Sequence, residues 1–492
     1  MSRSLLRATS LLVLLLSVVA AGGPADAARV ERPDQVGRWL VDGQGRVMIL
    51  HGVNMVAKRA PYAPDQTGFG RDDAAFLARN GFTAVRLGVI WRAVEPRPGK
   101  YDDRYLKRIR RTVEILADHG IWTMLDFHQD LYHERFQGEG APTWAVQDDG
   151  LPAEPRLGFP ANYFSMTAMQ RAFDHFWAND PGPGGVGLQV RYAKAWRHVA
   201  KVFRSTRGVM GMDLFNEPFP GSEFATCLQP LGCPTFDEKL TAFSQRSIDA
   251  IRRVDRRTVV FYEPNLFFNE GVPSHVSPRG RRLGFSFHDY CGTSALAGTY
   301  AGCDVFDPMV FDNADAQARK LADAPLLTEF GATTDQTTLR AVVDRAMEHR
   351  VGWQFWAYCG CDDPTTTGPG STQALVFDPA KPPRGGNVDH RKLRALAVPH
   401  PLRVAGTPAS YKFERDRRIF TLRWTPQKVG ALPGRFRAGA VTTVAVPRLQ
   451  YPHGYQVLVS GGRVLSEPGA RVLRIAQRAG TSEVWALVMP RR

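Results

Sequence analysis

The sequence predicts an α/β protein in which a (β/α)8 TIM barrel is followed by a C-terminal antiparallel β-sandwich. Eight short apolar runs alternate with amphipathic helical patterns over roughly 350 residues, as expected for such a barrel. Polar and acidic residues stand at the ends of these runs, where (β/α)8 enzymes place their sites. From about Pro399 short alternating segments separated by Pro and Gly replace the helical periodicity, which indicates an antiparallel β domain.

The predicted barrel strands are the apolar runs at 47–50, 83–87, 122–127, 209–215, 258–262, 284–288, 326–330 and 352–357. Apolar residues at helical spacing fill most of the gaps, at 104–119, 190–203, 237–254 and 338–350. A doubly wound open sheet is the competing fold. It is disfavoured because no Gly-rich phosphate-binding turn follows any of these runs.

The N-terminus has the pattern of a secretory signal peptide. Arg3 and Arg7 precede an apolar stretch at 11–21, and Ala25-Asp26-Ala27 has the small-x-small form of a cleavage site. The stretch is shorter than the roughly 20 residues of a membrane span, although an uncleaved anchor remains an alternative. We therefore expect a secreted, extracellular protein with a signal peptide at 1–27, a catalytic domain at 28–398 and a β-sandwich domain at 399–492.

Six cysteines fall in three close pairs. Six cysteines allow fifteen connectivities, so the sequence alone cannot fix the pairing. Neighbours close small loops at little entropic cost, which favours bonds between Cys227 and Cys233 and between Cys291 and Cys303. Cys359-Gly360-Cys361 would form a tight ring, so the pairing of these two cysteines stays open. No cysteine or histidine cluster has zinc spacing, and we expect no metal.

The chain is strongly basic, with a formal net charge of +15 and a pI near 9.7. Its basic residues look dispersed along the sequence, and no motif of a nucleic-acid-binding module is present. We expect no nucleic-acid partner. Peripheral contact with anionic lipid surfaces fits an exported basic protein, and the alternative is that the charge serves solubility alone. We expect a monomer.

Two glutamates carry the chemical interpretation. Glu217, in Asp213-Leu-Phe-Asn-Glu-Pro, and Glu329, in Leu327-Thr-Glu-Phe-Gly, each end an apolar run that Pro or Gly then breaks. A single such glutamate would more simply cap a loop or pair with an arginine. Two carboxylates about a hundred residues apart, both at strand ends of a barrel, indicate cleavage of a glycosidic bond.

Other polar and aromatic residues stand at the same predicted strand ends. Together they offer hydrogen bonds for the edges of a sugar ring and an aromatic surface for its face. They are His51, Asn54, Lys58, Arg86, Asp126, His128, Asn216, Glu263, Asn265, His288, Tyr290 and Trp356.

These residues resemble the active-site set of glycoside hydrolase family 5. The family pattern of Arg, His, Asn-Glu, His with Tyr, Glu and Trp is matched in order by Arg86, His128, Asn216, Glu217, His288, Tyr290, Glu329 and Trp356. Within the family the chain is most similar to endoglycoceramidases. The signs are the segments at 51–62, 125–130, 262–264 and 451–455, and the resemblance covers roughly residues 37 to 490.

The resemblance implies a retaining mechanism with Glu217 as acid/base and Glu329 as nucleophile, the latter held ionised by Arg86 and Tyr290. It implies that Asn216 holds the sugar 2-hydroxyl and that His288 orients the acid/base. The implied ligands of the innermost glucose are Lys58, Asp126 and His128, with Trp356 beneath the ring. No cofactor is expected, because two carboxylates suffice.

The expected substrate is a glycolipid, either a glycosphingolipid or another lipid glucoside. Apolar-rich loops at 129–187 and 266–268 follow the third and fifth runs and predict a groove for alkyl chains. The alternative is that their aromatic residues pack the loops onto the barrel. The leading hypothesis is a secreted endoglycoceramidase- or glucosylceramidase-like hydrolase, and the second is an endo-β-1,4-glucanase or mannanase of the same family. A non-catalytic binding protein is disfavoured because both glutamates are present.

Overall fold

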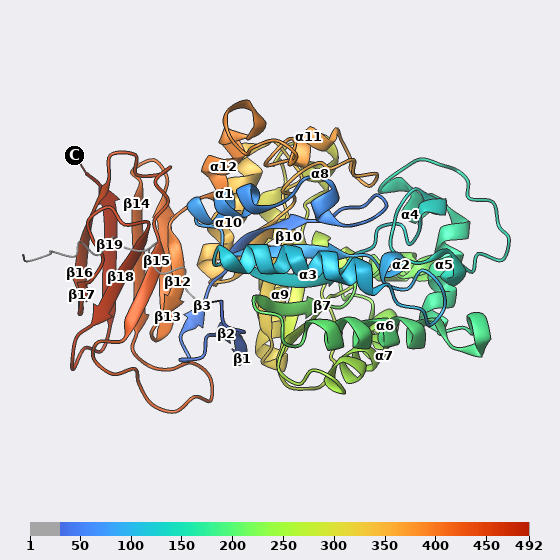
Figure 1. Cartoon of the computed structure of the whole chain (residues 1–492), viewed down its shortest axis with the longest axis horizontal. Coiled ribbons are helices and arrows are strands. Elements are labelled where there is room, and N and C mark those ends of the chain that lie inside the picture. The colour runs from blue at the N-terminus through green and yellow to red at the C-terminus, as the bar shows by residue number, and fades with distance from the viewer. Residues whose placement is uncertain (1–29, 492) are drawn as a thin grey trace, which may run out of the picture.

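The computed structural model describes residues 30–491, which form a barrel and a sandwich packed end to end (Figure 1). The expected signal peptide at 1–27 lies outside the described residues. Within residues 30–491, no helix is long and apolar enough to cross a membrane.

Eight parallel strands close the barrel in chain order, which confirms the predicted fold class. They are β4 (His51–Met55), β5 (Ala84–Val89), β6 (Trp122–Phe127), β7 (Val209–Asp213), β8 (Val259–Tyr262), β9 (Leu283–Asp289), β10 (Ala324–Phe330) and β11 (Gly352–Phe355). Every residue of these strands is buried, because side chains fill the barrel and helices cover its outside.

The first barrel strand differs from the one the sequence predicted. Val47–Met48 forms β3, which pairs with β12 (His400–Val404) in the C-terminal sheet, and β4 begins only at His51. His51 therefore lies at the N-terminal end of its strand, away from the site. Its ring stacks on Trp353 and His400, with centroids 4.3 Å and 3.7 Å away. Two apolar runs follow each other here, and their hydrophobicity alone does not tell which one joins the barrel.

The outer helices follow the expected amphipathic pattern. In α3 (Asp103–Asp118), the Asp102 side chain caps the helix by accepting from the backbone N–H groups of Arg104 and Tyr105, while Leu106, Ile109 and Val113 point inward. The other helices are α1 (Arg71–Arg79), α2 (Trp91–Val94), α4 (Ala161–Ser165), α5 (Thr167–Ala178), α6 (Leu188–Phe203), α7 (Pro234–Arg252), α8 (Gly292–Ala297), α9 (Cys303–Leu321), α10 (Gln336–His349), α11 (Gly370–Gln373) and α12 (His390–Leu396).

The sandwich consists of two antiparallel sheets. One has the order β1 (Asp34–Val36), β2 (Trp39–Val41), β3, β12, β15 (Val441–Ala445), β18 (Val472–Gln477) and β17 (Gly462–Val464). The other has the order β13 (Thr407–Glu414), β14 (Ile419–Thr425), β19 (Val484–Pro490) and β16 (Tyr455–Ser460). The sequence did not show that the first strands of the chain extend the C-terminal sheet.

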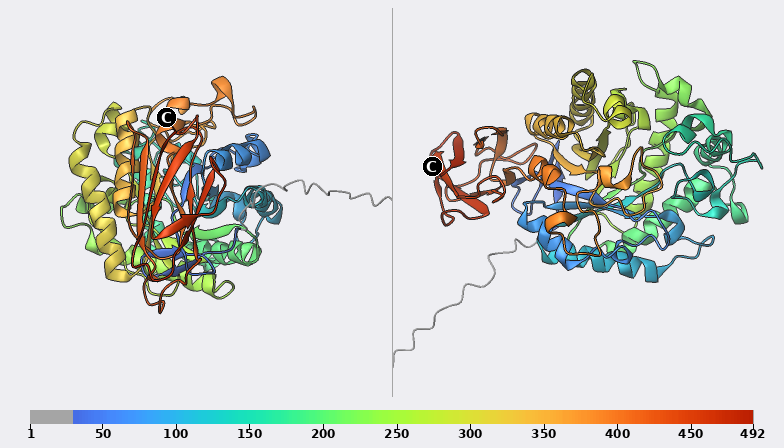
Figure 2. Two further views of the ribbon diagram at one scale, coloured as in Figure 1. Left: turned by 90° about the vertical axis from the view of Figure 1, so that its left-hand side faces the viewer. Right: turned by 90° about the horizontal axis from the view of Figure 1, so that it is seen from above.

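The sandwich covers the N-terminal end of the barrel. β3 leads directly into β4, the His51–His400 stack joins the two parts, and Arg415 of the sandwich pairs with Asp344 of α10 at 2.9 Å. Seen from the sandwich side, its sheets lie across the end of the barrel (Figure 2, left). The C-terminal strand ends therefore stay open at the opposite pole, near α4 and α5 in Figure 1.

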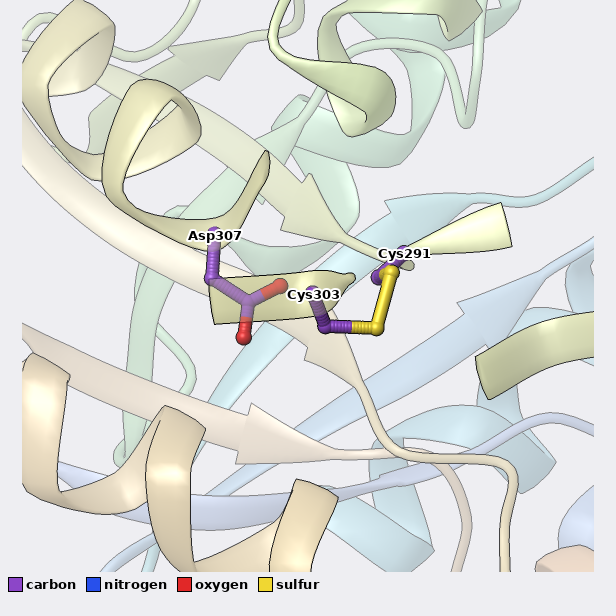
Figure 3. A group of neighbouring side chains, drawn as sticks. All are labelled: Cys291, Cys303 and Asp307. Atoms are coloured by element: carbon purple, nitrogen blue, oxygen red, sulfur yellow. A yellow bond between two sulfur atoms is a disulfide. The ribbon is translucent and has the colours of Figure 1, made fainter. Parts of the chain in front are cut away.

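Three disulfides lie on or near that open rim. The structure joins Cys227 to Cys233 and Cys291 to Cys303, the two pairs expected from the sequence, and it also joins Cys359 to Cys361. Asp307, near the start of α9, lies beside the Cys291–Cys303 bond (Figure 3). Because both sulfurs are bonded to each other, they are not available as thiolate ligands for a metal.

Candidate active site

The two glutamates meet at the open rim. Glu217 follows β7, Glu329 is near the end of β10, and His288 near the end of β9 lies between them. One side-chain atom from each of the three lies within 4.8 Å of the others. Retaining glycosidases hold their carboxyl groups about 5–5.5 Å apart, whereas inverting enzymes need roughly 6.5–9.5 Å to admit a water. The approach of one oxygen from each glutamate to within 4.8 Å fits the shorter of these two separations.

Arg86, from β5, is buried at the centre of the site and organises it. Its guanidinium donates to both the nucleophile candidate Glu329 and to Asn216, the latter at 2.9 Å. The same group contacts Asp213 at 3.0 Å, Glu263 at 2.9 Å, Asp126 at 3.0 Å and Asn54 at 3.3 Å. One cation therefore joins residues at the ends of six strands, β4 to β8 and β10.

Glu217 is held so that one of its oxygens faces the site. Its Oε1 accepts from Asn269 Nδ2 at 2.6 Å and lies 2.9 Å from His288 Nδ1. Its backbone N–H donates to Glu263 at 2.8 Å and stabilises a left-handed conformation with φ of 45°. Among residues 30–491 no hydrogen bond engages Oε2, so this oxygen is free to carry a proton toward a substrate.

The protonation states fit that arrangement. Burial and the negative charge of Asp130 raise the pKa of Glu217 to about 7. Burial lowers the pKa of His288 to about 4, so its ring is neutral at pH 7. The tautomer with its hydrogen on Nδ1 donates to Glu217. A neutral acid that accepts through Oε1 carries its proton on Oε2.

Glu329 accepts hydrogen bonds on both of its oxygens. The Tyr290 hydroxyl donates to its Oε2 at 3.0 Å, and Arg86 donates to its Oε1. Burial raises the pKa of Glu329, and the positive charges of Arg86 and His128 act against that rise. Hydrogen-bond donors on both oxygens favour the ionised form that a nucleophile requires.

A second polar cluster lies beside the glutamates. Lys58 Nζ contacts Asp130 at 2.5 Å, Thr365 at 2.7 Å and Asp363 at 3.2 Å. His128 lies 3.4 Å from Asp130 through Nε2. Although burial opposes ionisation of both bases, the charge of Asp130 raises the pKa of Lys58, and that of Asp126 raises the pKa of His128 to about 10.

Trp356 completes this cluster. Its ring lies 4.4 Å from Lys58 Nζ and stacks on His128 with centroids 5.2 Å apart. Its indole N–H donates to Gln373 at 3.1 Å, which fixes the ring plane. Lys58, His128 and Trp356, expected together from the sequence, thus lie side by side as a wall suited to a sugar.

Asp126 does not reach this wall, contrary to its expected role as a sugar ligand. The residue is fully buried, and its two oxygens contact Arg86 at 3.0 Å and His128 Nδ1 at 2.7 Å. Position along the chain explains the difference, because Asp126 lies inside the barrel within β6 whereas His128 and Asp130 come after the strand has ended. Asp126 positions His128, and Asp130 is the carboxylate at the wall.

Two residues of the site, Asp130 and Asn269, were missing from the residues that the sequence placed at the site, and Glu263 was given no specific role. Asp130 stands two residues beyond His128 in the quoted segment 125–130, so the signal for it was present. Asn269 directly follows the apolar triplet 266–268, and its contact with Glu217 is formed only in the folded protein. Glu263, noted only as a rim residue, links Arg86 to the backbone of Glu217.

The expected aromatic groove is largely absent, because most of the aromatic residues pack inward. Six residues of the loop 129–187 are at most 5 % exposed: Tyr132, Phe136, Tyr163, Phe173, Phe176 and Trp177. Phe267 and Phe268 are buried as well. Phe164 is the exception at 45 % exposed. The alternative interpretation of the sequence, that these residues attach the loops to the barrel, is correct for the majority.

Comparison with known proteins identifies the family. The model of cellulase (glycosyl hydrolase family 5) matches residues 41–362, and that of the glycoside hydrolase family 5 C-terminal domain matches residues 399–487. The chain belongs to glycoside hydrolase family 5. It is therefore an O-glycoside hydrolase, and the resemblance noted in the sequence is confirmed.

Several known proteins to which this chain is similar are endoglycoceramidases. Endoglycoceramidase I of Rhodococcus hoagii (strain 103S) is 34 % identical over 89 % of this chain and 84 % of the relative. The endoglycoceramidase of Hydra vulgaris is 27 % identical over 91 % of this chain and 86 % of its own. The lactosyl-enzyme intermediate of endo-glycoceramidase II from Rhodococcus sp. superposes with a TM-score of 0.75 at 32 % identity, covering 92 % of this chain and 100 % of the other.

The geometry predicts that Arg86→Lys disables the site while keeping its charge. Lysine cannot reproduce the fork that reaches Glu329, Asn216 and Glu263 together, and breaking a buried ion pair costs about 3–5 kcal/mol. We expect a lower melting temperature and a kcat/KM at least about 100-fold lower on a 4-nitrophenyl β-glycoside.

Arg108→Lys is the matched control for this substitution. Arg108 forks onto Asp65 on the surface, where a pair contributes at most about 1 kcal/mol. An Arg86→Lys enzyme as stable and active as the Arg108→Lys enzyme would contradict the central role of Arg86.

Proposed function

We propose that this chain is an exported retaining β-glycosidase that hydrolyses the bond between a glucose-linked head group and its lipid. The observation that carries the proposal is the close approach of Glu217 and Glu329 in two different electrostatic environments. The named relatives support the substrate class, since they are endoglycoceramidases and one solved relative is a ganglioside GM3 complex at 29 % identity and a TM-score of 0.75.

The first half of the reaction forms a covalent intermediate. The ionised carboxylate of Glu329 attacks the anomeric carbon, while Glu217 gives its Oε2 proton to the glycosidic oxygen as the bond from carbon to that oxygen breaks. The lipid leaves as a neutral alcohol. Glu217 is now ionised, and the hydrogen bonds from Asn269 and His288 stabilise its charge.

The second half reverses the roles. Glu217 takes a proton from a water molecule, which attacks the anomeric carbon and releases Glu329 as a carboxylate. The sugar leaves with its original β configuration. Two inversions at one carbon give overall retention, so the anomer of the product reports the mechanism directly.

The sugar-binding roles follow from free donors and acceptors. Arg86 occupies the Asn216 side-chain oxygen and the Gln129 carbonyl accepts one Nδ2 hydrogen at 3.1 Å, which leaves the second hydrogen for the 2-hydroxyl. Lys58 and His128 bind hydroxyls further round the ring. Trp356 supplies the apolar face.

A lipid aglycone is supported by an apolar surface beyond the acid/base, which we call the apolar rim. Its exposed residues are Phe164, Leu228, Leu231, Val305, Phe306 and Met309, each at least 40 % exposed. The disulfide-closed loops 227–233 and 291–303 contain no charged residue, in a chain whose charged fraction is 23 %. Uncharged, apolar loops on a basic protein suit contact with lipid.

Members of the apolar rim contact the segment 266–275, which follows β8. The ring centroids of Phe164 and Phe267 are 6.4 Å apart, and the Leu231 carbonyl lies 2.8 Å from the His275 side chain. Met309 packs against Gly271 in the segment that supplies Asn269. The apolar rim is thus connected to the residue that holds the acid/base.

Export is supported by the three disulfides, because such bonds persist in oxidising compartments. Together with the signal pattern at 1–27, they favour an extracellular enzyme. The N-terminal sequence of the protein recovered from the medium tests the cleavage site, and an intact leader on that protein would contradict it.

The retaining mechanism predicts distinct azide products. Glu329→Gly removes the nucleophile, so activity is lost and azide restores it with an α-glycosyl azide product. Glu217→Ala removes the acid/base, so azide yields the β-azide from an activated 4-nitrophenyl glycoside. Product anomers are identified by proton NMR. An inverted sugar product from the wild-type enzyme would contradict the assignment.

The alkaline limb of the activity profile reports the pKa of Glu217. Because Glu217 acts protonated, kcat/KM falls as pH rises through about 7. Asp130→Asn removes a negative charge that raises this pKa, so the limb moves to lower pH, by about one unit. Asp363→Asn, which also removes a carboxylate next to Lys58, serves as the control and leaves the limb in place. An unmoved or upward-shifted limb in Asp130→Asn would refute the coupling.

The apolar rim predicts a loss confined to lipid substrates. Leu228→Gln with Leu231→Gln should lower kcat/KM for a glucosyl- or lactosylceramide in vesicles about tenfold, since each leucine contributes part of the roughly 1.5–3 kcal/mol of full burial. Activity on a soluble 4-nitrophenyl glycoside stays unchanged. The matched control is Leu458→Gln with Val472→Gln, two exposed residues of the sandwich.

A glycolipid panel measured beside cello- and manno-oligosaccharides separates the two substrate classes. Cleavage of ceramide-linked sugars far faster than of soluble oligosaccharides supports the glycolipid assignment. Equal rates, or rim variants indistinguishable from the sandwich variants, would instead favour an endoglucanase or mannanase.

A further inference from the structure

The basic residues are not dispersed in the folded protein. The segment 191–207 contains Arg191, Lys194, Arg197, Lys201, Arg204 and Arg207 and no acidic residue. The segment 252–257 adds four arginines and one aspartate, and the segment 279–282 adds three arginines and no acidic residue. Folding brings these segments together, because α6 packs along α7 and both helices end at the N-terminal end of the barrel.

Three hollows of about 640, 440 and 400 Å³ join these segments into one trough. The first two share Arg204, Ser205 and Arg257, and the last two share Arg253 and Val254. Their linings come largely from the turns that directly precede β7, β8 and β9. We call this surface the arginine trough.

Many cations of the arginine trough have no counter-charge. Arg32, Arg207 and Arg282 pair with Asp255, Asp118 and Asp34. Other cations lining it have neither an ion pair nor a side-chain hydrogen bond within residues 30–491. These are Lys194, Arg197, Lys201, Arg204, Arg253, Arg256 and Arg257.

Helix stability does not explain the whole set. A cation at a helix C-terminus interacts favourably with the helix dipole, but the effect is confined to the last turn. It accounts for Lys201 in the last turn of α6 and for Arg204 and Arg253, which follow α6 and α7. Lys194 and Arg197 stand further back, and with Lys201 they form one face of α6 at spacings of three and four residues. A stripe of like charges on one helix is destabilising unless an anion binds it.

We propose that the arginine trough binds a linear polymer of phosphate groups. Arginine outnumbers lysine along it, and the guanidinium fork matches phosphate oxygens in bidentate geometry. Tyr101 and His198 are the aromatic side chains among those lining the three hollows, and they stack on each other with ring centroids 4.3 Å apart. A single stacked pair gives no series of platforms for successive nucleic-acid bases, so the contacts are chiefly to phosphates.

The location of the trough argues against a bilayer as its occupant. Two of its hollows lie before the strands, at the N-terminal end of the barrel, and the third runs along the outside of α6. The apolar rim and the two glutamates lie after the strands, at the open end. A flat membrane that supplies glycolipid to the rim cannot also touch the opposite pole. A flexible, soluble chain reaches the trough without blocking the active site.

Long-chain inorganic polyphosphate is the probe that tests this proposal. The trough variant carries Arg197→Gln, Lys201→Gln, Arg253→Gln and Arg257→Gln. The control variant removes the same charge from exposed positions of the C-terminal domain with Arg437→Gln, Arg448→Gln, Arg463→Gln and Arg471→Gln. Binding is measured by titration calorimetry at several salt concentrations, and hydrolysis of a 4-nitrophenyl glycoside is measured on the same preparations.

The wild-type protein and the control variant should bind polyphosphate with affinities within twofold of each other. The trough variant should bind at least tenfold more weakly, with a shallower dependence on salt because fewer counterions are released. All three proteins should hydrolyse the glycoside equally, so failure of the glycolipid assignment and failure of this proposal are separate results.

Two outcomes overturn the proposal. An equal loss of affinity in the control variant would mean that net charge, not the trough, attracts the polymer. Tighter binding of vesicles of anionic lipid than of polyphosphate, lost in the trough variant, would make a membrane the occupant.

Discussion

The site depends on a single buried cation. Arg86 is completely enclosed, and four carboxylates surround it: Asp126, Asp213, Glu263 and Glu329. Without its charge these groups would repel one another or take up protons, since burial alone raises carboxyl pKa values. The same guanidinium donates a hydrogen bond to Asn216 and another to Glu263. Glu263 in turn accepts a hydrogen bond from the backbone N–H of Glu217. The proposed nucleophile, acid/base and 2-hydroxyl ligand are thus all held, directly or through Glu263, by one side chain.

Two glutamates of identical chemistry acquire different roles from their surroundings. Glu217 accepts its hydrogen bonds through one oxygen and lies within reach of the Asp130 charge, so it stays protonated up to about pH 7. Glu329 receives donors on both oxygens. Such separation of environments is how an active site obtains an acid and a nucleophile from the same residue type. The neutral His288 between them serves both roles without adding a charge.

The sequence was most informative where function and strand ends coincide. The positions of four residues at the ends of apolar runs were enough to place them in one site: Glu217, Glu329, His128 and Trp356. The prediction from sequence failed where tertiary packing determines which side chains are buried. Hydrophobicity did not separate β3 from β4. Asp126 lies within β6 and below the sugar wall, and Asp130, beyond the end of the strand, is the carboxylate at the wall. The aromatic residues of 129–187 matched a groove and a core equally well, and the arginine trough arises from segments far apart in the chain.

A 2-deoxy-2-fluoro-β-glycosyl fluoride tests the central claim most directly, because the fluorine slows breakdown of the covalent intermediate more than its formation. Mass spectrometry of the inactivated, digested protein should find one sugar on the peptide that contains Glu329, and Glu329→Gln should remain unlabelled. The Arg86→Lys enzyme should label much more slowly, since its nucleophile is no longer aligned. A label on Glu217 or on any other residue, or no covalent adduct in an enzyme that the reagent inactivates, would contradict the account.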